Sequence, residues 1–142
     1  MSGYAVRRFM TLAPKVVAAG STLGEAHRIM REHCIRHLPV VDGGALVGVV
    51  SQRDVYLLET LKGVDPATAR VDDAMAAEPY AVGPDAPLAE VAGEMARRRI
   101  GSAVVVERGE VIGLFTTVDA LGALVTLSRG RGADRGRVRG AP

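Results

Sequence analysis

The feature that most constrains this chain is an internal repeat. Shifted by 65 residues, the sequence aligns with itself without a gap, and 13 of the 49 positions from 6 to 54 match their partners, where chance would give only a few. The identities fall mainly on apolar residues and glycine, and include Gly48 with Gly113 and Asp54 with Asp119. Self-similarity at a fixed period indicates two copies of one structural unit. We assign the copies to residues 6–61 and 71–127, joined by a linker at 62–70.

Each copy carries the same order of predicted elements: strand, helix, strand, strand, helix. Short strands are expected at 16–17 and 81–82. The helices that follow have apolar residues at 23, 26 and 30 and at 88, 91 and 95, the spacing of one helix face. Turns at 42–44 and 107–110 predict hairpins, and second helices begin near 53 and 118. A copy of fewer than about 60 residues is marginal alone. We therefore predict an α+β fold whose two copies pack about a pseudo-twofold axis.

The charge of the chain is concentrated at one end. Residues 128–142 hold five arginines and one acid, which leaves 13 basic and 15 acidic residues in 1–127. The body therefore lacks the basic surface of a nucleic-acid-binding protein. The Arg/Gly-rich tail at 128–142 cannot bury apolar surface, so we expect it to be disordered. One interpretation of the tail is a weak, salt-sensitive contact with RNA, DNA or an acidic partner, and the favoured interpretation is a solubilising tail.

Several classes of protein are excluded by what the sequence lacks. One cysteine cannot form an internal disulfide framework, no apolar run approaches the length of a membrane helix, and no signal-peptide pattern follows the first residues. We therefore expect a cytoplasmic protein without a membrane contact. The sequence contains no phosphate-binding lysine loop, no serine nucleophile elbow and no zinc-protease motif. Catalysis is not expected.

A short motif recurs where the last strand of each copy meets the last helix. It reads Gly-apolar-apolar-Ser/Thr-x-x-Asp, with Ser51 and Asp54 in copy one and Thr116 and Asp119 in copy two. One interpretation is a capping box that only starts a helix. The other is a binding site, because a carboxylate in this position can hold both hydroxyls of a ribose. The glycine would let a flat ring or another backbone approach. Recurrence at one register in both copies favours the binding site.

All three histidines and the only cysteine lie within eleven residues, at His27, His33, Cys34 and His37. A metal site is not expected, because His33 points away from the helix face shared by His27 and Cys34 and because His37 falls in the next strand. Cys34 is expected to be a small buried residue beside Ile35.

The chain resembles the tandem CBS-domain pair, or Bateman module, over about residues 5–127. The resemblance rests on Arg36-His37-Leu38-Pro39-Val40-Val41-Asp42, on residues 46–54, and on their counterparts at 101–107 and 111–119. It implies clefts between the copies that bind an adenosyl ligand, namely AMP, ADP or ATP, or else S-adenosylmethionine. It also implies a homodimer shaped as a flat disk, and no bound cofactor.

The resemblance also implies roles for single residues. Asp54 and Asp119 match the ribose-binding acid, and Ser51 and Thr116 match the hydroxyl that faces phosphate or sugar. The other positions that it assigns to the ligand are Val16, Arg36, His37, Leu38, Pro39, Arg53, Ala81, Gly101, Ser102 and Ala103.

The two copies differ at these positions. Copy two has Gly101-Ser102-Ala103-Val104 where copy one has Arg36-His37-Leu38-Pro39, although Arg97, Arg98 and Arg99 stand just upstream. We therefore expect non-equivalent sites, with phosphate-binding charge on one side. The leading hypothesis is a non-enzymatic sensor that passes its ligand state to an unidentified partner. The alternative is a dimeric interaction scaffold whose clefts are vestigial.

Overall fold

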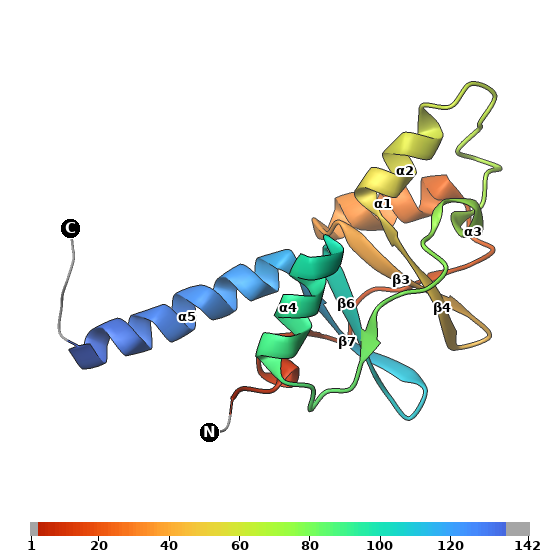
Figure 1. The fold of residues 1–142 in the computed structure, drawn as a ribbon. Helices are drawn as coiled ribbons and strands as arrows, with labels where there is room; N and C mark the ends of the chain where they lie inside the picture. Colours follow the sequence, from red (N-terminus) through yellow and green to blue (C-terminus); the bar gives the residue numbers. More distant parts are fainter. Residues whose placement is uncertain (1–2, 136–142) are drawn as a thin grey trace.

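The structure, a computed structural model, describes residues 3–135 and the side chains of residues 3–130, and it has two similar lobes (Figure 1). The first lobe contains β2 (Val17–Ala18), α1 (Leu23–His33), β3 (His37–Asp42), β4 (Ala45–Ser51), α2 (Gln52–Glu59) and α3 (Val71–Ala74). The second contains η1 (Val6–Arg8), β1 (Thr11–Leu12), β5 (Ala81–Val82), α4 (Leu88–Arg98), β6 (Ser102–Glu107), β7 (Glu110–Thr116) and α5 (Thr117–Arg135).

Each lobe is built on one sheet. The strand order is β2-β3-β4 in the first lobe and β1-β7-β6-β5 in the second. In both lobes the short strand runs parallel to the next one, which then forms an antiparallel hairpin. The register shifts at Val40/Val41 in one hairpin and at Val105/Val106 in the other, which are equivalent positions. The predicted α+β repeat is therefore confirmed, down to the same irregularity in both copies.

The helices α1 and α4 face the cores with the residues that their spacing predicts. Leu23 and Met30 are no more than 2% exposed, and Val91 and Met95 no more than 4%. The Thr22 hydroxyl starts α1 by accepting a hydrogen bond from the amide of Glu25 at 3.1 Å. These helices bury one apolar stripe each, and their opposite faces carry the charges.

Cys34 is exposed, whereas the sequence led us to expect a buried side chain. It ends α1 in the left-handed conformation, with φ 54°, and Arg99 ends α4 in the same way, with φ 58°. The chain turns at this position, so Ile35 packs against the core instead of Cys34. The helix end decides which of the two neighbouring residues is buried.

The residues that begin each copy pack in the lobe formed by the other copy. Val6 is fully buried in the second core with Val91, and Val71 is fully buried in the first core. The amide of Val6 donates to the carbonyl of Ala86 at 2.8 Å, and the amide of Val71 donates to the carbonyl of Ser21 at 2.8 Å. These two hydrogen bonds are related by the shift of 65 residues. Neither core is complete without the start of the other copy.

Gly48 and Gly113 lie where these exchanged segments cross the sheets. A Cβ atom on Gly48 would come within 2.5 Å of Met75 Sδ and 2.7 Å of the Ala76 carbonyl oxygen. A Cβ atom on Gly113 would meet the side chain of Met10, which is the counterpart of Met75. The glycine of each motif therefore admits the backbone or side chain of the other copy, rather than a flat ligand ring.

The last helix differs most between the copies. α2 ends at Glu59, whereas α5 continues to Arg135 and projects away from the body (Figure 1). The sequence predicts a disordered tail from residue 128, and the structure extends the helix over the first residues of that segment. Adding residues to an existing helix costs far less than starting one, which accounts for the difference. Residues 136–142 of the predicted tail lie outside the described residues.

None of the described helices is both long enough and apolar enough to cross a membrane.

We expect Gly48→Ala to lower the free energy of unfolding by about 1–3 kcal/mol, because the added methyl group overlaps the backbone of Ala76. Gly113→Ala should cost less, because its neighbours belong to the flexible side chain of Met10. Urea denaturation measures both effects. Gly93 is the control, since it is exposed on α4 with no atom within 4 Å of an added Cβ. Gly93→Ala should stabilise the chain by about 0.5–1 kcal/mol. Equal effects at Gly48 and Gly93 would contradict the close approach.

Candidate functional site

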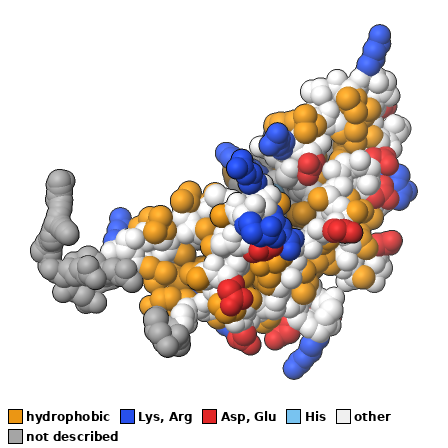
Figure 2. Space-filling view, in the orientation of Figure 1, with side chains coloured by type: hydrophobic (Ala, Val, Ile, Leu, Met, Phe, Trp, Pro, Cys, Tyr) orange, Lys and Arg blue, Asp and Glu red, His pale blue; other side chains and the backbone are white. Residues whose placement is uncertain are grey.

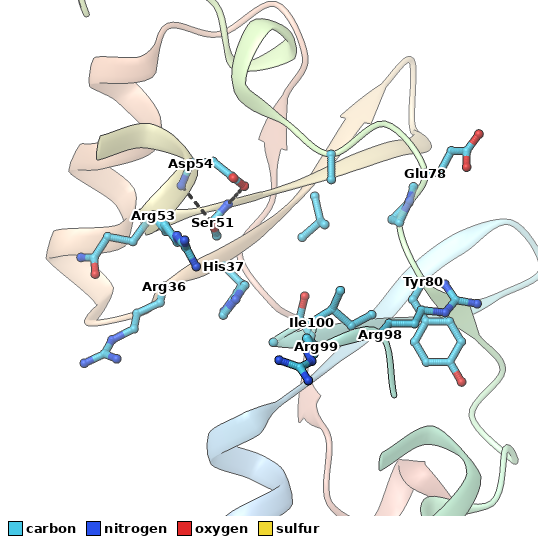
Figure 3. A pocket seen from close by; sticks show the side chains of 16 residues that line it. Arg36, His37, Ser51, Arg53, Asp54, Glu78, Tyr80, Arg98, Arg99 and Ile100 are labelled. Atoms are coloured by element: carbon cyan, nitrogen blue, oxygen red, sulfur yellow. Dashed lines mark hydrogen bonds between the residues drawn. The ribbon is translucent and has the colours of Figure 1, made fainter. Parts of the chain in front are cut away.

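A cavity of about 530 Å³ lies between the two lobes, and we call this place the first seam (Figure 3). Its lining consists of Arg36, His37, Val49, Ser51, Gln52, Arg53 and Asp54 from copy one, and of Ala76, Glu78, Pro79, Tyr80, Arg98, Arg99, Ile100, Gly101 and Ser102 from copy two. The volume falls in the range of small-molecule sites, about 300–1,000 Å³. The exchanged segment that contains Ala76 brings part of copy two to the end of β4, so the cavity has walls from both copies.

Ser51 and Asp54 form the capping box at the start of α2. The Ser51 hydroxyl accepts from the Asp54 amide at 3.0 Å, and Asp54 Oδ2 accepts from the Ser51 amide at 3.0 Å (Figure 3). Both side chains are also part of the cavity lining. The two interpretations of the motif are therefore compatible, because the cap holds the carboxylate at the cavity while one of its oxygens carries the hydrogen bond.

Four arginines line the cavity, two from each lobe. Arg36 and Arg53 come from the first lobe, and Arg98 and Arg99 come from the second (Figure 3). In the space-filling view, Lys and Arg side chains gather near the junction of the lobes (Figure 2). The opposing carboxylates in the lining are Asp54 and Glu78. Basic side chains therefore outnumber acidic ones in the cavity.

Arg98 is held in place on the cavity wall. It donates to Glu94 at 2.5 Å, and its guanidinium lies 4.7 Å from the centre of the Tyr80 ring. Hydrogen bonds from Arg97 and Arg98 lower the pKa of Glu94 to about 2. Among the side chains described over residues 3–130, Arg36, Arg53 and Arg99 form no ion pair. Three of the four cationic groups are thus available to an anion.

His37 crosses from the first lobe toward the second. A Cβ atom on Gly101 would lie 2.9 Å from His37 Nε2, so the glycine at the position equivalent to Arg36 makes room for this ring. Burial lowers the pKa of His37, and Arg36 lowers it further, while Asp54 opposes the shift. His37 is therefore neutral at pH 7 and becomes easier to protonate when negative charge is added beside it.

The structure brings seven of the predicted site residues into the cavity and leaves the others outside its lining. Leu38, Pro39 and Ala103 are buried within β3 and β6, where their side chains belong to the sheets rather than to the cavity. Val16 and Ala81 are exposed and are not part of the lining. Spacing along the chain could not separate the buried positions from those at the seam, because side-chain direction depends on how the strands pack.

Thr116 and Asp119 occupy the equivalent positions of copy two, at the start of α5. The Thr116 amide donates to Asp119 Oδ2 at 2.9 Å, and the Asp119 amide donates to the Thr116 hydroxyl at 3.3 Å. They form the same capping box as Ser51 and Asp54. We call their surroundings, related to the first seam by the shift of 65 residues, the second seam.

Sequence reasoning missed the part of the cavity that copy two supplies before β5. Ala76, Glu78, Pro79 and Tyr80 line it because their segment is exchanged between the lobes. The repeat itself was the signal that could have revealed this wall, since both repeats begin with a segment long enough to reach the neighbouring copy.

Over the described residues no three His, Cys, Asp or Glu side chains lie close enough together to hold a metal ion. His27 instead contacts Glu59, with Nδ1 3.3 Å from Oε2.

Solved structures with the same fold include three that contain an adenosine derivative. CBSX2 in complex with AMP superposes with a TM-score of 0.77 at 27% identity, covering 89% of this chain and 99% of that one. The CBS domain pair of MJ0100, with 5′-methylthioadenosine and S-adenosyl-L-methionine, gives 0.76 at 25% identity, with coverage of 89% and 99%. The CBS domain of a bacterial CNNM/CorC family Mg²⁺ transporter, in complex with ATP, gives 0.74 at 28% identity, with coverage of 85% and 87%.

Two curated relatives are similar in sequence. Inosine-5′-monophosphate dehydrogenase from Korarchaeum cryptofilum is 39% identical over 117 residues, which cover 82% of this chain but only 22% of that protein. The CBS domain-containing protein YhcV from Bacillus subtilis is 29% identical over 114 residues, covering 80% of this chain and 81% of YhcV. The family described as CBS domain matches residues 6–58 and 71–126. With its two matched repeats, two equivalent sheets and a cavity between them, the chain belongs to the CBS domain family as a tandem pair.

Proposed function

We propose that the chain is a non-enzymatic sensor that binds an adenine nucleotide in the first seam and passes its ligand state to a partner protein. The observation that carries the proposal is the cavity between the lobes, with Asp54 at one wall and arginines from both lobes around it. The adenosine derivatives bound by structural relatives support the ligand class.

Asp54 is the group best suited to the sugar. Its Oδ2 already accepts the Ser51 amide, and this hydrogen bond fixes the carboxylate at the N-terminus of α2. A fixed carboxylate can accept hydrogen bonds from ribose hydroxyls without losing side-chain entropy on binding. The Ser51 hydroxyl lies at the same wall of the cavity.

The arginines make the ligand a link between the lobes. A phosphate chain that contacts Arg36 or Arg53 on one side and Arg99 on the other would be held by both lobes. Guanidinium groups bind phosphate oxygens through paired hydrogen bonds, which are stronger than neutral ones. A ligand shifts a conformational equilibrium only if it prefers one of the states. Bridging phosphates supply that preference, since their contacts depend on the relative position of the lobes.

The same charges rank the candidate ligands. ATP and ADP bring more phosphate to the arginines than AMP does, so they should bind more tightly. S-adenosylmethionine carries a positive sulfonium group where a nucleotide carries phosphate, and like charges in a cleft repel. We therefore place S-adenosylmethionine last for the first seam.

Thermal unfolding in the presence of ATP, ADP, AMP or S-adenosylmethionine tests the proposal. ATP at 100 times its dissociation constant should stabilise the chain by about 2.7 kcal/mol, and the stabilisation should decrease in the order given. Asp54→Ala should abolish the shift because the ribose contact is lost.

Asp119→Ala is the matched control, because it removes the equivalent capping box outside the cavity. Each substitution should cost about 1 kcal/mol of stability in the absence of ligand. Only Asp54→Ala should remove the response to ATP. If no adenosine compound stabilises the chain, and both variants show only the cost of a lost cap, the interaction scaffold is the correct function instead.

Protonation of His37 provides a separate test. Burial lowers its pKa in the free chain, and nearby phosphate should raise it toward the usual value of about 6.5. ATP binding near pH 6 should therefore take up protons at His37, and affinity should rise as the pH falls through this range. Calorimetry in two buffers of different ionisation enthalpy measures the uptake. His37→Gln should reduce it, whereas His33→Gln, at an exposed position of α1, should not. Equal uptake by the wild type and His37→Gln would place the phosphates elsewhere.

We also propose that two copies of the chain associate through α2 and α5. α5 exposes Val118 to 72% and Leu121 to 57%, and α2 exposes Leu57 to 58%. The two helices occupy equivalent places in the two lobes, and hydrophobic side chains cover both on the face shown in Figure 2. A helix with apolar residues on several sides requires a covering partner. An apolar cavity of about 320 Å³ between α4 and α5 adds to this surface.

The dimer can be tested by sedimentation velocity with Leu121→Glu. Placing a charge in an apolar interface should convert the dimer to a monomer at micromolar concentration. Thr126→Glu, at an exposed polar position of the same helix, is the control and should remain dimeric. A monomeric wild-type chain would refute the dimer and leave the ligand proposal standing.

A further inference from the structure

The acid of the second seam is already satisfied by hydroxyl groups of the chain itself. Thr11 Oγ1 lies 3.3 Å from Asp119 Oδ1 and 3.4 Å from Oδ2. The Thr116 hydroxyl donates to Oδ2 at 3.1 Å, beside the bond from the Thr116 amide. Both oxygens of Asp119 therefore have a donor from within the chain.

Thr11 reaches Asp119 because of the exchange between the lobes. It belongs to β1, a strand of copy one that pairs with β7 of copy two, with Thr11 opposite Leu114. This pairing fixes the threonine beside the first turn of α5. Its hydroxyl thus stands in front of the carboxylate as part of a paired strand and not of a loose loop.

The first seam lacks this hydroxyl. The residue equivalent to Thr11 is Ala76, which bridges to Val49 in the same antiparallel manner. A methyl group cannot donate a hydrogen bond. Asp54 accepts the Ser51 amide through Oδ2, and Ala76 leaves its Oδ1 without the partner that Thr11 gives to Asp119.

The consequence follows from how a carboxylate binds ribose, which is by accepting from its hydroxyls. In the second seam a ribose would have to displace Thr11 and repeat a bond that already exists, so little would be gained. The charges add to the difference. The positions equivalent to Arg53, Arg98 and Arg99 are Val118, His33 and Cys34, so three of the four arginines of the first seam have no arginine counterpart in the second.

We propose that Thr11 closes the second seam to nucleosides by supplying the hydroxyl that a ribose would supply, and that Ala76 keeps the first seam open. Thr11 and Ala76 together determine which seam binds the nucleoside, so each chain binds one adenosyl ligand. This inference rests on the proposed function of the first seam.

Calorimetric titration of the full chain with AMP tests it, because AMP carries a single phosphate and depends less than ATP does on Arg53 and Arg99, which have no arginine counterpart in the second seam. The wild type should bind one AMP per chain. Thr11→Ala gives the second seam an alanine at the position that Ala76 occupies in the first seam. This variant should bind two AMP molecules per chain. Thr11→Ser keeps the hydroxyl and should bind one. Adding Asp119→Ala to Thr11→Ala should remove the second site again.

The reverse change tests the first seam. Ala76→Thr should weaken AMP binding about tenfold or more, since its hydroxyl can now occupy Asp54. Ala76→Val has the same shape without the hydroxyl and should weaken binding less. Two sites in the wild type, one site in Thr11→Ala, or equal losses in Ala76→Thr and Ala76→Val would overturn this inference while leaving the proposed function intact. A wild type that binds no AMP would overturn both.

Discussion

The structure depends on the exchange of the first segments between the two copies. Val6 and Val71 each complete the core of the opposite lobe, and the exchanged backbones bond there in the same register. Units of this size bury too little surface to be stable alone, and the exchange joins two small cores into one cooperative body. The seams exist because the exchanged segments hold the two lobes side by side in a fixed relative position.

The candidate site is a product of that arrangement. The exchanged segment carries Ala76 to the end of β4, where Gly48 leaves space for its backbone, and this places the wall of copy two opposite Asp54. The capping box then serves two purposes, because it begins α2 and also holds a carboxylate at the cavity. Arginines on both walls give the cavity an excess of positive charge that bridges the lobes. An anion bound there would contact parts of the chain that are otherwise linked only through the crossings.

A scaffold with an internal repeat thus carries two seams whose side chains differ at a few positions. Gly101 stands at the position equivalent to Arg36 and makes room for His37 in the first seam. Ala76 stands where the other seam has Thr11, and this difference decides whether the acid has a partner within the chain. The two hairpins and their irregularity are shared between the copies, so the differences at Gly101 and Ala76 come from side chains.

The sequence by itself determined the repeat, the order of its elements and the faces of α1 and α4, because these follow from local periodicity and from an alignment without gaps. It also located Ser51, Asp54, Arg36 and His37, which a single motif and its surroundings mark. Only the tertiary structure decided that each copy completes its neighbour and that Tyr80 and Arg99 line the same cavity as Asp54. It also decided that Leu38 and Ala103 are buried in their sheets and that Cys34 is exposed. These outcomes depend on contacts between residues far apart in the chain and on the direction of side chains at strand and helix ends, and neither is encoded in local spacing.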